Sequence, residues 1–165
     1  MKLLVISAFL VFLILPIAGQ KRLREVDLRI SGVGSGSSYS TVVRKIGKPV
    51  STKTEKYDSS ESCSGVSETL TLKYAGLELS LLREGLGKKL RVYAIDVTSR
   101  KWLASGLRVG ANTANVRKRF GQPNSQAVVG GKLIYYYVTP GNLGGVNFEF
   151  KNGKLARILM TETLC

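Results

Sequence analysis

Histidine is absent from this 165-residue chain, and the chain contains only two cysteines. The imidazole side chain is the commonest general base and the commonest metal ligand in proteins, so neither of these usual roles is available here. Two thiols alone do not complete a structural zinc site, which takes four cysteine or histidine ligands. We therefore expect no catalytic residues, no cofactor site and no metal site, and we predict that the protein is not an enzyme.

Acidic residues are also scarce, because 11 Asp and Glu stand against 25 Lys and Arg and leave a formal charge of +14. A charge of this size favours association with acidic partners. The candidates are an acidic protein, anionic lipid head groups of a membrane surface, or an acidic glycan. The alternative is a solvated basic surface without a dedicated ligand.

Residues 1–20 start with a short positive stretch, continue as an almost unbroken apolar run and end in small residues. This order is typical of a secretory signal peptide, and the run is shorter than the roughly 20 residues that a membrane-spanning helix needs. Cleavage after Gly19 would remove segment 1–19, and the alternative is an uncleaved anchor. Gln20 stands where a bacterial lipoprotein carries its lipid-bearing cysteine. We therefore expect a soluble periplasmic or secreted protein without a lipid anchor, and export disfavours nucleic acid as the partner.

Export would place Cys63 and Cys165 in an oxidising compartment, where a pair of cysteines usually forms a disulfide. A bridge between them would close a loop of about a hundred residues, which the chain-entropy model values at roughly 4 to 5 kcal/mol. Two unpaired thiols are the alternative.

The first half of the mature sequence opens with a charged lead-in and a glycine- and serine-rich loop over residues 20–35, which we expect to be mobile at its start. Apolar spacing and the flanking residues predict a short helix over Tyr39–Ile46, ended by Gly47 and Pro49. Alternating runs after it predict an antiparallel meander, with a short edge strand as an option at its start. These strands are expected at Lys53–Tyr57, Glu68–Tyr74, Leu77–Arg83 and Leu90–Thr98.

The second half contains the same kinds of element in the same order. Asn112 or Thr113 caps a helix whose buried pair, Val116 and Phe120, is spaced at i and i+4, and Gly121 precedes a proline that ends it. The strands expected after it are Ser125–Val129, Lys132–Val138, Val146–Phe150 and Leu155–Thr163.

The two helix segments align at an offset of 74 residues, with identities at Gly36/Gly110, Val42/Val116, Gly47/Gly121 and Pro49/Pro123. The shared order of elements supports a duplication. We therefore predict an α+β fold of two tandem helix-plus-antiparallel-sheet repeats, residues 36–99 and 100–165, with the short helices packed on one face of the sheet.

The second half also carries a fuller pattern, made of Gly110, Val116, Phe120, Gly121, Gln122, Pro123, Tyr135, Tyr137, Val146, Phe148, Phe150, Gly153, Lys154 and Ile158. This pattern resembles the SmpA/OmlA family, which includes the small lipoprotein of the outer-membrane β-barrel assembly machine. The tandem arrangement is similar to β-lactamase inhibitory protein-like folds. The resemblance implies a non-catalytic scaffold that binds proteins or envelope components.

These observations predict an exported binding or scaffold module that contacts an envelope or secreted protein. The alternative is a basic surface that binds acidic polymers or an anionic membrane. The candidate interaction residues are Arg117, Lys118 and Arg119 on the second helix, with Tyr136 and Trp102. Tyr136 belongs to the run Tyr135–Tyr137, in which neighbouring strand residues alternate between faces, so at least one of the three is expected in the core or in cross-strand packing. Trp102 either packs at the join between the halves or contacts a ligand.

Overall fold

The computed structural model describes residues 24–58, 66–84 and 89–162. The elements are α1 (Tyr39–Ile46), β1 (Ser51–Asp58), β2 (Val66–Tyr74), β3 (Leu77–Glu84), β4 (Arg91–Val97), α2 (Thr113–Phe120), β5 (Ser125–Val129), β6 (Lys132–Val138), the 3-10 turn η1 (Pro140–Asn142), β7 (Gly144–Lys151) and β8 (Lys154–Glu162). All the strands belong to one antiparallel sheet in the order β1-β2-β3-β4-β8-β7-β6-β5.

Both helices are short, and side-chain caps define where they start. The Ser38 hydroxyl accepts a hydrogen bond from the Thr41 backbone N–H at the start of α1. At the start of α2, Asn112 and Asn115 each accept from the other's backbone N–H, at 2.9 and 3.2 Å. Helices of eight residues are too short to be stable alone, so both depend on docking against the sheet.

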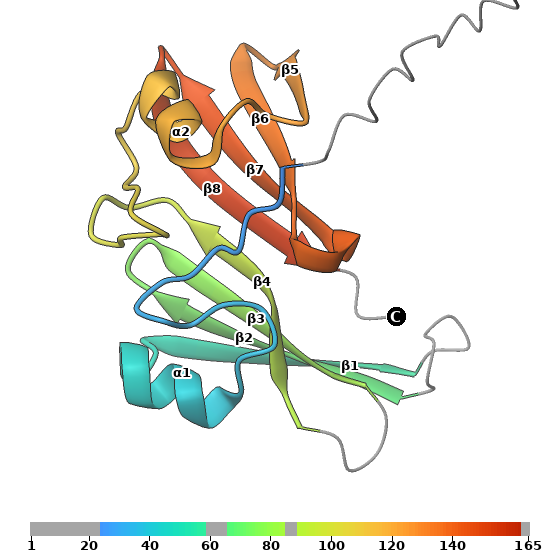
Figure 1. The fold of residues 1–165 in the computed structure, drawn as a ribbon. Helices are drawn as coiled ribbons and strands as arrows, with labels where there is room; N and C mark the ends of the chain where they lie inside the picture. The colour runs from blue at the N-terminus through green and yellow to red at the C-terminus, as the bar shows by residue number, and fades with distance from the viewer. Residues whose placement is uncertain (1–23, 59–65, 85–88, 163–165) are drawn as a thin grey trace, which may run out of the picture.

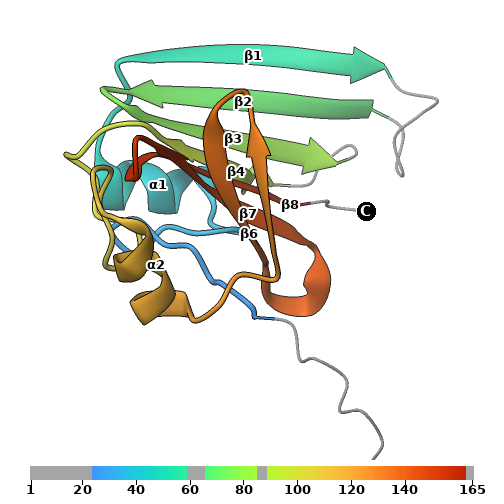
Figure 2. The same cartoon turned by 90° about the horizontal axis from the view of Figure 1, so that it is seen from above.

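The helices and the N-terminal segment lie on one face of the sheet, which we call the covered face (Figures 1 and 2). Residues 24–35 run along this face from β6 toward α1, and the connection between β4 and α2 packs on them through a bridge from Ile30 to Ala104. The opposite face, which we call the open face, carries no described helix.

One hydrophobic core lies beneath the covered face and extends along the sheet from β2 to β6. Its N-terminal part is aliphatic, while its C-terminal part is aromatic, with Phe148 packed 5.5 Å from Tyr137 and 5.3 Å from Phe120 between ring centroids. The fully buried strand residues include Leu72, Leu79, Leu81, Val92, Ile95, Val97, Tyr137, Val146, Phe148 and Ile158.

The expectation of two tandem helix-plus-sheet repeats is wrong. The ladder between β4 and β8, from the pair Ala94/Thr161 to the pair Val97/Ile158, merges all eight strands into one sheet. The core is likewise one cluster that runs across this junction. Two half-sheets that each left an apolar edge and face exposed would be less stable than one shared sheet, because edge pairing satisfies the backbone groups and extends the buried layer.

The expectation of a mobile lead-in is wrong for residues 24–33. Val26, Leu28 and Ile30 are at most 1% exposed, and the Val26 N–H donates to the Val138 carbonyl at 2.8 Å. Val26, Leu28 and Ile30 alternate with charged residues, so this part of the segment buries one side against the core like a strand, although only isolated bridges form.

The predicted signal peptide over residues 1–19 and both cysteines, Cys63 and Cys165, lie outside the described residues. In the part of the chain that is described, no helix is long and apolar enough to cross a membrane.

Candidate functional site

The C-terminal turn of α2 presents the three predicted interaction residues Arg117, Lys118 and Arg119, and all three are exposed. The fully buried Val116 and the part-buried Phe120 fix the orientation of this helix. Positive side chains at a helix C-terminus interact favourably with the helix dipole, so their placement here is locally stable.

Backbone carbonyls hold two arginines of this surface in place. Arg119 Nε donates to the Ser105 carbonyl at 2.9 Å. Arg108 Nη1 donates to the carbonyls of Arg100 and Lys101, each at 2.8 Å. A guanidinium group has five N–H donors, so each of these groups keeps donors for an anion after its backbone contact is made.

Two more arginines lie directly against glycine backbone. A Cβ added at Gly110 would come within 2.8 Å of Arg100 Nε, and one added at Gly121 within 3.4 Å of Arg24 Nε. Both glycines have positive φ values, 96° and 81°, which other residues rarely adopt. The missing side chains therefore leave room for these guanidinium groups close to the main chain.

Arg117 and the end of α2 are both anchored on the aromatic part of the core. The Arg117 guanidinium lies 4.9 Å from the centroid of the Tyr135 ring, within the range of a cation–π contact. The buried Tyr137 hydroxyl donates to the Gly121 carbonyl at 2.8 Å, just after the helix. Burial raises the pKa of Tyr137 to about 12, so this donor keeps its proton at neutral pH.

We call the seven exposed cations of this region the basic cluster: Arg24, Arg100, Lys101, Arg108, Arg117, Lys118 and Arg119. None of them forms an ion pair with a carboxylate among the described side chains. The sequence from 97 to 148 contains no acidic residue at all. The cluster is therefore a surface of uncompensated positive charge whose guanidinium groups are partly fixed in position.

Trp102 belongs to the neighbouring connection and is held within the fold. Its Nε1 donates to the Ala75 carbonyl at 2.9 Å, and its ring meets Tyr74 edge-on at 6.0 Å. Lys101 Nζ lies 5.2 Å from the ring centroid. These contacts fasten the connection to the turn between β2 and β3, beside the basic cluster.

Tyr136 lies apart from the basic cluster, on the open face of β6. Its ring packs over the backbone of Gly145 on β7, and its hydroxyl donates to the Gly144 carbonyl at 3.4 Å. The five predicted interaction residues therefore divide between the two faces.

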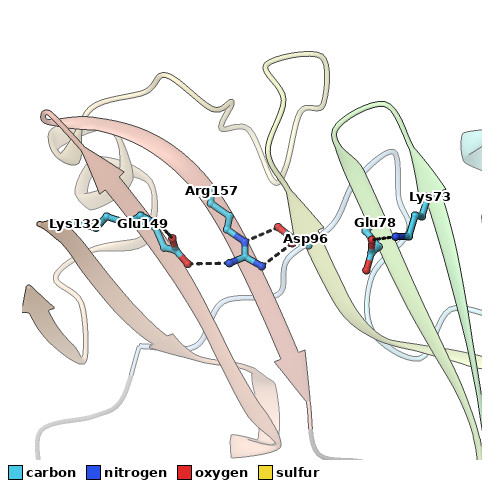
Figure 3. A network of polar contacts seen from close by, with 6 residues as sticks. All are labelled: Lys73, Glu78, Asp96, Lys132, Glu149 and Arg157. Carbon is cyan, nitrogen blue, oxygen red and sulfur yellow. Dashed lines mark hydrogen bonds and ion pairs between the residues drawn. The ribbon is translucent and has the colours of Figure 1, made fainter. Parts of the chain in front are cut away.

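The open face carries a line of charged residues that the sequence-based reasoning did not pair (Figure 3). Arg157 makes hydrogen bonds of 2.8 and 2.7 Å to the two Asp96 oxygens and an ion pair of 3.4 Å with Glu149. Lys132 pairs with Glu149 at 3.1 Å, and Lys73 pairs with Glu78 at 3.5 Å. The hydrogen bond to Asp96 raises the pKa of Arg157. The line contains three basic and three acidic residues, so its formal charges balance.

A small cavity of about 180 Å³ opens beside this line, where Glu78 and Asp96 lie on neighbouring strands. Its wall is mainly polar, and both carboxylates already have cationic partners. Across the described residues, no group of three or more histidine, cysteine or acidic side chains is placed to hold a metal ion.

The sequence patterns did not predict that Arg108 belongs to the basic cluster. They also did not predict that Arg108 lies in the same region as Arg24 and Arg100. The one available signal was the acid-free stretch from 97 to 148. The convergence itself depends on the fold, because the docked N-terminal segment brings Arg24 to Gly121.

No protein-family model and no curated protein matches this sequence. A similar solved structure is an extracellular protein containing an SCP domain from Bacillus anthracis str. Ames, at 12% identity and a TM-score of 0.46. The alignment covers 77% of this chain and 43% of that one, so the chain spans less than half of its length. A DUF4309 family protein from Bacillus subtilis subsp. subtilis str. 168 aligns at 12% identity over 77% of this chain and 79% of its own, with a TM-score of 0.39. Neither is described as an SmpA/OmlA protein, and that resemblance stays a prediction.

Proposed function

We propose that this protein is an exported, non-catalytic binding module whose basic cluster recognises an acidic partner outside the cytoplasm. The signal-peptide pattern of residues 1–20 supports export. The observation that carries the proposal is the segregation of charge: the seven cations of the cluster have no described carboxylate partner, whereas the charges of the open face are paired.

Hydrogen bonds from arginine side chains to backbone carbonyls also favour binding. A side chain that is already held by a backbone carbonyl loses less rotational freedom when it meets an anion, so more of the interaction energy appears as affinity. Arg108 and Arg119 are held in this way. Guanidinium groups also match carboxylate and phosphate oxygens in pairs, which a lysine does not.

The test uses a matched pair of double variants in the mature protein. Arg117→Gln with Lys118→Gln removes two charges from α2, while Arg44→Gln with Lys45→Gln removes two from the last turn of α1. Fluorescent poly-glutamate is the probe for an acidic polypeptide, and phosphatidylglycerol vesicles are the probe for an anionic membrane. Binding is titrated at several salt concentrations.

An exposed ion pair contributes about 0.2 to 1 kcal/mol, so the α2 variant should bind roughly 2- to 30-fold more weakly at low salt. The α1 variant should retain most of the affinity, and the affinity of the unmodified protein should fall steeply as salt rises. Equal losses in both variants, or binding that does not respond to salt, would overturn the proposal. Strong binding to vesicles together with none to poly-glutamate would assign the cluster to a membrane surface.

A further inference from the structure

The two edges of the sheet are built from different residues. β5 forms one edge, and all five of its residues are exposed and uncharged. Val128 is 73% exposed and Val129 is 59% exposed. β1 forms the other edge and carries four charged residues, Lys53, Glu55, Lys56 and Asp58.

Charged residues on an edge strand discourage other chains from pairing with it, and an uncharged edge lacks this protection. The backbone of β5 is therefore available for pairing, because its only ladder within the described chain is with β6. β5 ends in a two-residue turn, Gly130-Gly131, with φ values of 55° and 73°. A turn of this kind closes with a hydrogen-bonded pair, here Val129 and Lys132, so Gln126 and Val128 direct their N–H and C=O groups away from β6.

Uncompensated positive charge lies beside this edge on the covered face. Gln126 is opposite Tyr135, whose ring carries the Arg117 guanidinium at 4.9 Å on the covered face. On the open face, Val129 is opposite Lys132, whose side chain is 47% exposed and whose ammonium group pairs with Glu149 at 3.1 Å. Both cations and β5 itself belong to the acid-free stretch from 97 to 148.

This charge determines which kind of molecule can pair with the β5 edge. A second copy of this chain would bring Arg117 of both copies together in a protein with a formal charge of +14. An extended acidic segment would instead place its carboxylates beside Arg117 on the covered face and its apolar residues beside Val129 on the open face. Main-chain hydrogen bonds give affinity in such strand addition, and alternate side chains give specificity.

We infer that β5 binds an extended acidic segment of a partner protein as a ninth strand of the sheet. This inference rests on the proposed function, because the acidic partner is the one that the basic cluster recognises. It adds that the partner is a polypeptide and that its backbone is recognised together with its charge. The apolar residues of the segment contact Val129 on the open face, while its acidic residues approach Arg117 on the covered face.

The experiment uses a short peptide that alternates valine and glutamate, and the same peptide with alternate backbone nitrogens methylated. Methylation removes main-chain donors and leaves the charge unchanged. The inference predicts that methylation weakens binding roughly tenfold or more, from the loss of two or more hydrogen bonds. Amide hydrogen exchange at Gln126 and Val128 should slow when the unmethylated peptide saturates the protein, while exchange on the β1 edge should not change.

Val128→Pro supplies the matching change in the protein, since proline on an edge removes an outward N–H. It should weaken binding of the peptide roughly threefold or more while leaving the unfolding midpoint close to that of the parent. Equal affinity for the two peptides would overturn the inference, and the proposed function would stand if the α2 double variant still lost affinity. No binding of any acidic probe would overturn both. Concentration-dependent protection of the β5 amides without peptide would assign the edge to a second copy and overturn the inference.

Discussion

On the open face, Arg157 lies between Asp96 and Glu149, with nitrogen–oxygen distances of 2.7 and 3.4 Å. On the covered face, Arg117 lies over an aromatic ring and Arg119 against a carbonyl, and neither contacts a described carboxylate. The same residue type is therefore used for internal pairing on one side and for an uncompensated surface on the other.

The difference separates charges that support the fold from charges that are available for binding. Glu149 is only 11% exposed in its side chain, so removing its partners would leave a carboxylate with little access to water. The seven residues of the basic cluster are all exposed, and water can solvate them when no partner is present. Substitutions in the open-face line should therefore lower the stability of the fold and leave binding unchanged. Substitutions in the basic cluster should weaken binding and leave the stability nearly unchanged.

Removal of the central cation of the open face should have the largest effect on stability. Arg157→Met leaves Asp96 and Glu149 without this partner. We expect the free energy of unfolding to fall by about 2 to 3 kcal/mol, less than for a fully buried pair because the Arg157 side chain is 37% exposed. Urea unfolding measures the change. Poly-glutamate binding should be unaffected, and a loss below 0.5 kcal/mol would mean that this line of charges contributes little.

The glycine beneath Arg100 should give the next largest effect. Gly110→Ala forces a side chain into a backbone with φ of 96° and places its Cβ against Arg100, so a loss of roughly 1 to 3 kcal/mol is expected. Gly36→Ala is the control, since Gly36 has φ of 74° and no atom near an added Cβ. The control should therefore lose only the stability that the strained backbone costs, without the contact with Arg100. Thermal unfolding measures both variants. Equal losses would show that contact with Arg100 does not matter.

The buried tyrosine below α2 predicts a dependence on alkaline pH. The folded-state pKa of Tyr137 is about 12, above the ordinary value of 10.0. Burial stabilises the neutral phenol, so this contribution is complete below pH 10 and is lost as pH rises toward 12. Tyr137→Phe should flatten the stability curve in this window, measured by urea unfolding at each pH. An unchanged slope in the variant would contradict the assignment.

Neutralising a cation of the basic cluster should have the smallest effect on stability. Arg117→Gln removes an exposed cation–π contact, and we expect a change within about 0.5 kcal/mol. Titration with poly-glutamate should nevertheless detect weaker binding by the same variant. A large loss of stability would place Arg117 among the residues that support the fold.

Local sequence patterns located the elements well, and they failed where distant segments meet. The spacing of Val42 and Ile46 and the caps predicted α1 at its observed bounds, Tyr39–Ile46. The same spacing rule placed Arg117 to Arg119 on the outer side of α2. Hydrophobic periodicity contains no information about which strands lie next to each other. It therefore could not predict the ladder between β4 and β8, which contradicts the expected tandem repeats.

The N-terminal segment was misread for a related reason. Its apolar residues Val26, Leu28 and Ile30 alternate with charged ones, and that alternation is a strand pattern, but the surrounding charges suggested a solvated lead-in. The basic cluster was only partly predictable, because Arg24 joins it through a segment docked from the far end of the sequence. The ion pairs of the open face follow from strand register, which alternation alone does not fix.

The docked N-terminal segment also constrains the order of folding. The Arg24 N–H donates to Asn124 Oδ1 at 2.7 Å, although the two residues are 100 positions apart in sequence. This segment therefore reaches its place only after β6 has formed, since the Val26 N–H donates to the Val138 carbonyl. Contacts of such long range form slowly because loop-closure entropy must be overcome first. The segment should then close last over the finished sheet, and the apolar stripe beneath it stays exposed to chaperones and proteases until it does.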